Sequence, residues 1–265
     1  YNRFLNVSYS TFDYDTNTWV DNPDYTDKYN FDETIYAAYA NYNSTFWGLQ
    51  TSFGLRLEYM DRLLLRQGND DTYKYDQLNV FPGISVLKSF NENHSLKFAL
   101  TNRINRPDEY MMNPFPEFED DYFLSVGNPY LIPETVRNLE LGYTFSKGNT
   151  MFSSNLYYRQ TNDKLEQKLT INEDDKILVM FHNDAKDSTL GLELMGNVEI
   201  TDWWTLNANA NLFNYYITAN VDGIKNSRNA LSWSTQLVNS FDITETTSFQ
   251  IIGSYASKTV RSQGE

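Results

Sequence analysis

The chain has 265 residues, a formal net charge of −14 and no cysteine. The lack of thiols excludes disulfide frameworks, cysteine metal sites and thiol nucleophiles. The acidic balance argues against nucleic acid, because a phosphate-binding face needs clustered lysine and arginine. Aromatic residues make up 16% of the chain, which favours strands, and no run of roughly 18 apolar residues predicts a transmembrane helix.

Apolar and polar residues alternate in several segments with a period of two, which predicts half-buried β-strands. In the first clear segment Leu55 and Leu57 alternate with Arg56 and Glu58. The same alternation recurs at 96–101, 139–145, 190–200 and 206–212. The segments at 188–201 and 203–218 exceed the nine to eleven or so residues that cross a bilayer at a tilt. We expect about eleven strands in all.

Short and long connections alternate between these strands. The short ones are Asn43-Ser44-Thr45, Asn91-Glu92-Asn93, Lys147-Gly148-Asn149, Thr201-Asp202 and Thr244-Glu245-Thr246. The long ones are Asp15–Lys28, Leu63–Lys74, Asp108–Val136, Lys164–Asp187 and Ala219–Asn229, with 168–171 and 177–181 expected to extend as a hairpin. An antiparallel meander places short turns at one end and long loops at the other, as in outer-membrane barrels. The sequence therefore predicts an all-β, antiparallel, up-and-down transmembrane β-barrel.

In such a barrel the apolar set faces lipid and the charged set faces the lumen, because a charge at the bilayer midplane costs roughly 2–4 kcal/mol. We therefore expect an inward orientation for five charged residues: Arg56, Glu58, Lys97, Glu140 and Glu193. Aromatic pairs near strand ends, such as Trp203-Trp204 and Tyr215-Tyr216, are typical of the membrane interface.

Three motifs in the middle of the chain carry a family resemblance. They are Arg106-Pro107, Asn113-Pro114-Phe115 and the run from Gly127-Asn128-Pro129 to Pro133-Glu134. With them, the segment Leu96–Phe145 resembles the C-terminal half of the barrel of TonB-dependent outer-membrane receptors, most closely the Bacteroidota outer-membrane β-barrel type. From their residue types we read Arg106, Pro107, Asn113, Pro114, Gly127, Asn128, Pro129, Pro133 and Glu134 as structural elements that shape the outer loop.

The resemblance implies a location in the bacterial outer membrane and the uptake of a scarce ligand such as a siderophore, vitamin, glycan or peptide. Family barrels have 22 strands, so residues 1–265 would form about half of one. No plug domain is visible in the sequence, and we expect the chain to be part of a longer polypeptide. The implied partners are outer-membrane lipid, the protein's own N-terminal plug and TonB, and a surface lipoprotein is a further candidate.

The long connection between 108 and 136 combines aromatic, sulfur and acidic side chains, which suit recognition of a sugar, peptide or chelate. The candidate ligand-binding residues are Tyr110, Met112, Phe115, Phe118, Asp120, Asp121 and Tyr122. The alternative is that these side chains fold the loop onto itself or onto a plug. Acidic runs here and at 173–175 suggest solvated loop charge more than a cation site.

Catalysis is not expected, because the only histidines, His94 and His182, fall in connections at opposite ends of the sheet and no nucleophile–base motif stands out. No metal site or cofactor is predicted. Two other functions remain open: a smaller passive porin-like or assembly-associated outer-membrane barrel, and a soluble extracellular glycan-binding β-protein.

Overall fold

A computed structural model describes residues 2–7, 10–21, 27–66, 71–118, 122–172, 175–221 and 224–260. No helix among them is long and apolar enough to cross a membrane. The elements are β1 Asn2–Val7, β2 Ser10–Asp13, β3 Thr18–Asp21, β4 Asp27–Phe46, β5 Leu49–Arg66, β6 Thr72–Ser89, β7 His94–Asn105, α1 Glu109–Met112, β8 Glu117–Phe118, β9 Phe123–Ser125, β10 Glu134–Lys147, β11 Thr150–Ile171, β12 Ile177–Thr201, β13 Trp204–Val221, β14 Ile224–Thr244 and β15 Thr247–Ala256.

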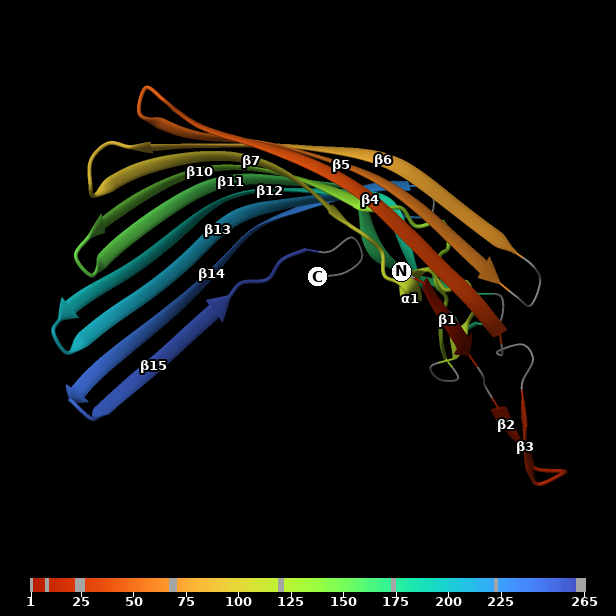
Figure 1. Cartoon of the computed structure of the whole chain (residues 1–265). Coiled ribbons are helices and arrows are strands. Elements are labelled where there is room, and N and C mark those ends of the chain that lie inside the picture. The colour runs from red at the N-terminus through yellow and green to blue at the C-terminus, as the bar shows by residue number, and fades with distance from the viewer. Residues whose placement is uncertain are drawn as a thin grey trace.

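The main sheet has 13 strands, eleven of which form an antiparallel meander in the order β1-β4-β5-β6-β7-β10-β11-β12-β13-β14-β15, and β2 and β3 form a separate two-stranded sheet. The expected up-and-down topology is confirmed, and the meander has the expected eleven strands; the short strands β2, β3, β8 and β9 are additional. The sheet curves like the wall of a wide tube, with short turns at one end and long connections at the other (Figure 1). The short strand β9 is an exception, because it pairs in parallel with β12 at the long-connection end.

Cross-strand register shows which side chains share a face, because directly paired residues of a sheet point the same way. Arg56 pairs with Tyr39 and Phe81, Glu140 with Ala99 and Tyr157, and Glu193 with Asn155 and Asn211. The register places all five charged residues expected inside on one face: Arg56, Glu58, Lys97, Glu140 and Glu193. This face is the concave one, because Glu58 accepts a hydrogen bond from Arg106 of the connection that lies on the concave side (Figure 1). The inward orientation of the five residues is confirmed.

The convex face carries the apolar set. Its side chains remain substantially exposed, as lipid-facing side chains must; they include Leu55, Leu57, Leu141, Leu192, Leu194, Leu212 and Trp233. At the short-turn end Trp203 and Trp204 lie next to Phe241, with ring centroids 6.0 and 5.9 Å away. Tryptophan at this level suits the membrane interface, where the ring is in apolar surroundings and its N–H is wet.

The first predicted turn is wrong. Asn43-Ser44-Thr45 lies inside β4, and the chain reverses at Trp47-Gly48, where φ is 51° and 71°. Two positive φ values define a type I′ turn, whose twist matches the flanking strands. The register continues to Phe46 opposite Leu49, so pairing with β5 overrides the local turn preference of Asn and Ser.

Several long connections are shorter than predicted. Leu63 pairs with Lys74 and Ala219 with Asn226, so most of these two expected loops is strand. The expected loop Asp15–Lys28 contains β3 and the start of β4. The hairpin expected at 168–171 and 177–181 is confirmed, with Thr170 opposite Leu178. Among the described residues, the connection between β7 and β10 is the one that remains long, and it positions the site described next.

Candidate functional site

The connection from β7 to β10 folds into the concave side of the sheet (Figure 1). Met112 and Leu131 are fully buried in a cluster with Tyr29, Phe31 and Leu64 from β4 and β5. Burying a side chain of this size stabilises by roughly 1.5–3 kcal/mol. The loop is therefore held against the barrel wall by an apolar core at the outer end, where an outer-membrane barrel carries its long loops.

Within the loop, two motifs predicted to be structural contact each other directly. The Gly127 N–H donates to the Asn113 carbonyl oxygen at 2.8 Å, and the Asn128 N–H donates to Met111 O at 2.7 Å. A Cβ on Gly127 would lie 2.4 Å from Asn113 O and 2.5 Å from Asn113 N. Only glycine allows two backbones to approach this closely. The Asn113 side chain accepts the Phe115 N–H at 3.1 Å, which turns the chain toward the wall.

The return of the loop is fixed to β12 by two asparagine side chains. Asn128 Nδ2 donates to Phe181 O at 3.1 Å. Asn183 Oδ1 accepts the Ile132 N–H at 2.8 Å, and its Nδ2 donates to Ile132 O at 2.9 Å. The loop backbone thus satisfies its hydrogen bonds through side chains where it has no ladder partner.

Two charged residues close the ends of the loop. Glu134 accepts hydrogen bonds from Asn105 Nδ2 at 2.8 Å and from the Leu165 N–H at 2.6 Å. Arg106 donates to the buried carboxylate of Glu58 on β5. Charge-assisted hydrogen bonds of this kind are roughly twice as strong as neutral ones, so both strand ends are firmly tied to their neighbours.

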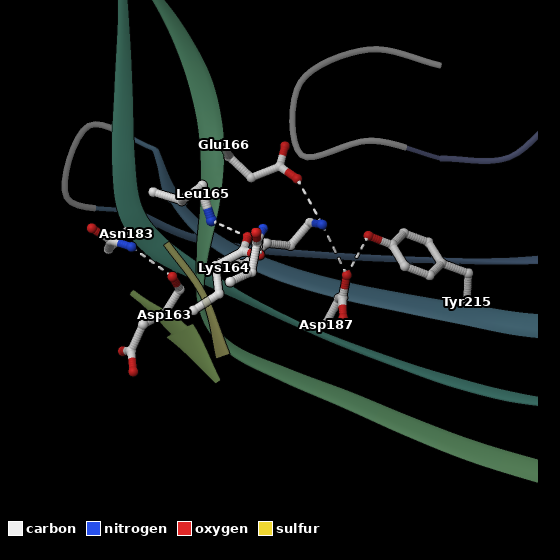
Figure 2. A network of polar contacts seen from close by, with 9 residues as sticks. Asp163, Lys164, Leu165, Glu166, Asn183, Asp187 and Tyr215 are labelled. Atoms are coloured by element: carbon white, nitrogen blue, oxygen red, sulfur yellow. Dashed lines mark hydrogen bonds and ion pairs between the residues drawn. The ribbon is translucent and has the colours of Figure 1, made fainter. Parts of the chain in front are cut away.

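A polar network lies beside Glu134 on β11, β12 and β13 (Figure 2). Lys164 Nζ lies 3.1 Å from Asp187 Oδ2 and 3.6 Å from Glu166 Oε1. The Tyr215 hydroxyl donates to the same Asp187 oxygen at 2.9 Å. The β11–β12 register shifts on both sides of Lys164, and Asp163 has a φ of 53°. This bulge re-aims the lysine toward the carboxylates, a common use of β-bulges near functional sites.

The electrostatics of this part of β11 and β12 follows from burial and from nearby carboxylates. Burial opposes the charge of Lys164, but Asp187, Glu166 and Glu134 outweigh it and raise the pKa of the ammonium group. The pKa of His182 shifts in the opposite direction. Burial is the main cause that lowers the pKa of its imidazole; Asp184 opposes this shift and Lys168 adds to it, so the ring is neutral at pH 7.

A cavity of about 650 Å³ opens next to the network. Its walls combine charged and aromatic side chains: Lys164, Glu166, Phe181, Phe213 and Tyr215. The size is that of a small-molecule site, and aromatic walls with a few polar groups are typical of such sites. This cavity, the network and the folded loop together form the candidate functional site.

The structure separates the candidate ligand-binding residues into two groups. Tyr110 and Tyr122 are exposed, with 57% and 71% of their surface accessible, and the Tyr110 ring meets Phe181 edge-on at 6.3 Å. Met112 and Phe115 are buried, at 0% and 3%. Phe118 pairs with Leu124 in the β8–β9 hairpin, while Asp120 and Asp121 lie outside the described residues.

The proline and histidine positions also follow from the fold. Pro107 and Pro133 are buried, and Pro114 and Pro129 are half-buried. His94 opens β7 beside a short turn and contacts the Tyr143 hydroxyl at 2.7 Å, whereas His182 lies in the extension of β12 at the other end. Across the described ranges, no group of three metal-ligating side chains comes together.

Sequence reasoning missed the residues that hold the site together. Asn183, Lys164 and Asp187 lie in a segment read as a loop, and Tyr215 was read only as part of an aromatic pair. The alternation at 190–200 has Glu193 on the inner face. If the same period of two is continued back along the chain, Asp187 falls on that face as well. Nothing local signals Asn183, because its partner Ile132 is 51 residues away.

A family model described as the outer membrane protein beta-barrel family matches residues 2–265. The chain belongs to this family. Its members are outer-membrane proteins, so the predicted location in the bacterial outer membrane is confirmed, and the soluble glycan-binding alternative is excluded.

Solved structures with the same fold include a siderophore receptor, a copper transporter and an iron transporter. The siderophore receptor PirA from Pseudomonas aeruginosa matches with a TM-score of 0.58 and 13% identity over 98% of this chain and 56% of its own. The copper transporter OprC matches with a TM-score of 0.59 and 14% identity over 88% of this chain and 38% of its own. The FrpB iron transporter from Neisseria meningitidis matches with a TM-score of 0.51 and 12% identity over 80% of this chain and 33% of its own. No curated protein matches the chain by sequence.

The chain spans between about a third and just over half the length of these solved proteins. The expected resemblance to the barrels of TonB-dependent receptors is confirmed at the level of the fold, and the Bacteroidota type stays a prediction. The edge strands β1 and β15 of the sheet do not pair with each other among the described residues. An open sheet of this kind is consistent with the expectation that the chain forms part of a larger barrel.

Proposed function

We propose that this chain forms part of the barrel of an active outer-membrane receptor that takes up a scarce ligand with energy relayed by TonB. The observation that supports this most is the match of 98% of the chain to a siderophore receptor. The fold alone does not select a cargo. The siderophore, copper and iron named for PirA, OprC and FrpB are the first cargoes to test, ahead of vitamins, glycans and peptides.

The folded loop at the outer end supports a gated receptor over an open pore. Three features hold this loop on the concave face: its buried apolar cluster, the contact between Asn113 and Gly127, and the two hydrogen bonds of Asn183 with Ile132. A passive porin needs a continuous water-filled channel. In our proposal the remaining lumen is closed by the protein's own plug domain, with the 650 Å³ cavity open to the cell exterior. The role is binding and transport, and we propose no catalytic step.

Uptake in living cells tests the proposal. The full-length parent protein is expressed in a strain lacking its own receptors, and entry of iron-55 siderophore complexes and of copper-64 is followed. We expect uptake of at least one cargo that stops when TonB is deleted or a protonophore is added. Binding of the purified parent protein to the periplasmic domain of TonB is the second readout.

Two results would contradict active transport. The first is uptake that continues without TonB and with the protonophore present. The second is rapid swelling of liposomes that contain the parent protein when small sugars are added, because swelling reports an open passive pore. Either result would favour the smaller porin-like barrel.

A further inference from the structure

A second cavity, of about 550 Å³, opens on the concave face where β4, β5, β6 and β7 meet. It shares no lining residue with the outer-end cavity. Gly54 and Gly83, which are cross-strand partners, lie among its lining residues. A Cβ on Gly54 would lie 3.0 Å from Asn41 Oδ1. Two adjacent glycines leave room that larger side chains would fill.

The pairing between β6 and β7 is interrupted at this cavity, next to Pro82. The β6–β7 ladder starts only at Ile84 opposite Leu100. Pro82 has no N–H to donate across the gap, and the Asn102 side chain instead donates to Pro82 O at 2.7 Å. The described part of β6 that precedes Ile84 pairs with β5 and not with β7. The cavity therefore extends between β6 and β7.

Positive charge gathers around the cavity. Arg56, Arg103 and Arg106 line it with a single carboxylate, Glu58. Each oxygen of Glu58 already contacts one arginine, Oε1 with Arg56 and Oε2 with Arg106. One guanidinium, that of Arg103, is exposed and makes no ion pair within the described parts of the chain. In a protein with a net charge of −14, this local excess creates a field that attracts anions.

Two buried polar atoms at the same cavity also lack partners. Arg106 Nε and Thr101 Oγ1 are shielded from solvent and have no hydrogen-bond partner in the described structure. Leaving a buried donor unpaired costs about 1–3 kcal/mol, so such atoms are rare unless a ligand or water completes them. These unpaired atoms are a second observation that points to an occupant.

From these features we propose that the cavity lined by Arg56, Arg103 and Arg106 binds a carboxylate-bearing solute on the inner wall of the barrel. A guanidinium presents paired N–H groups that match the two oxygens of a carboxylate. Tyr39 and Phe81 supply aromatic surface for the organic part, and the volume lies within the range of small-molecule sites. The inference rests on the proposed function, since it places an anion site on the path of an imported ligand.

Titration calorimetry with citrate on the full-length parent protein in detergent tests this. We expect saturable binding that weakens with added salt, and no binding of the uncharged triethyl ester. Arg103→Gln should weaken citrate binding roughly tenfold, as expected for loss of a charge-assisted hydrogen bond. The matched control is Arg159→Gln, another exposed arginine on the concave face but outside this cavity, which should bind like the wild type.

Glu58→Gln has the opposite expected sign. It removes the carboxylate that competes for Arg56 and Arg106, so citrate should bind more tightly. If this buried substitution prevents folding, Arg103→Gln still decides, because Arg103 is exposed.

The proposal is overturned if citrate binding is absent, if the ester binds equally well, or if Arg103→Gln binds citrate like the wild type. A lower melting temperature of Arg103→Gln with unchanged citrate binding would also overturn it, and would show that a carboxylate of the protein itself fills the cavity. Because the readout is binding, it can succeed or fail independently of TonB-dependent uptake.

Discussion

Asn183 pairs with both backbone groups of Ile132, accepting its N–H at 2.8 Å and donating to its carbonyl at 2.9 Å. The same Nδ2 also lies 2.6 Å from Asp163 O. One side chain on β12 therefore imitates a strand partner for the returning loop and reaches the bulge of β11.

Replacing Asn183 by alanine should loosen this loop. It leaves the N–H and carbonyl of Ile132 without partners in a half-buried position, at a cost of about 1–3 kcal/mol. We expect a lower melting temperature of the full-length parent protein in detergent and faster protease cleavage within 106–133. Asn207→Ala, on the concave face of β13, is the control and should change neither. Equal protease resistance of the two variants would contradict the clamp.

Gly127→Ala tests the contact between the two loop motifs. The added methyl would overlap the Asn113 backbone at 2.4–2.5 Å, and neither backbone can move without breaking the 2.8 Å hydrogen bond. We expect a loss of roughly 2–4 kcal/mol in the free energy of unfolding, measured in urea. Gly196→Ala is the matched control, because a Cβ there meets nothing within 4 Å. A Gly127→Ala protein as stable as this control would refute the steric argument.

The Lys164–Asp187 pair should matter more than a surface ion pair. Asp187→Asn leaves the largely buried Lys164 with one ion-pair partner, Glu166, at 3.6 Å, and we expect a loss on the order of 2 kcal/mol in unfolding free energy. Adding Lys164→Met should restore part of it, since the uncompensated charge is removed. The control is Asp184→Asn, because Asp184 forms a longer ion pair with Lys168, at 3.9 Å. An equal loss of unfolding free energy in this control would contradict the claim that the Lys164–Asp187 pair matters more.

His182 predicts a pH dependence of stability. Burial lowers the pKa of its imidazole in the folded protein, so below about pH 6.5 the unfolded chain binds more protons than the folded one. Stability should fall as pH falls through this range, and become constant with respect to this group below the folded pKa. His182→Gln should show a smaller decrease in melting temperature between pH 7.5 and 5 than the wild type. An identical decrease would exclude this histidine as the cause.

The sheet was readable from the sequence because its signal is local. Alternation around Arg56 and Glu58, with the cost of charge in lipid, was enough to orient a whole face. The turn at Trp47-Gly48 was not readable, because Asn43 and Ser44 are stronger turn residues and only the register with β5 excludes them.

The site was less predictable than the sheet because its contacts are distant in sequence. Gly127 and Asn113 were recognised as motif residues, but the hydrogen bond that joins them appears only in the folded loop. Met112 looks the same in a sequence whether it faces a ligand or Leu131. Its role as a ligand contact stays a prediction, since a buried side chain contacts cargo only if the loop moves.

The strand β12 has 25 residues, whereas about ten cross the bilayer. At roughly 3.3 Å per residue, a large part of the β11–β12 hairpin stands clear of the membrane on the side of the long loops. Asp175, which is exposed at the end of this hairpin, is therefore a site for an epitope tag that antibodies could reach on intact cells. Such a tag would report the number and movement of copies of this protein in the living membrane while leaving the loop anchored at Asn183 untouched.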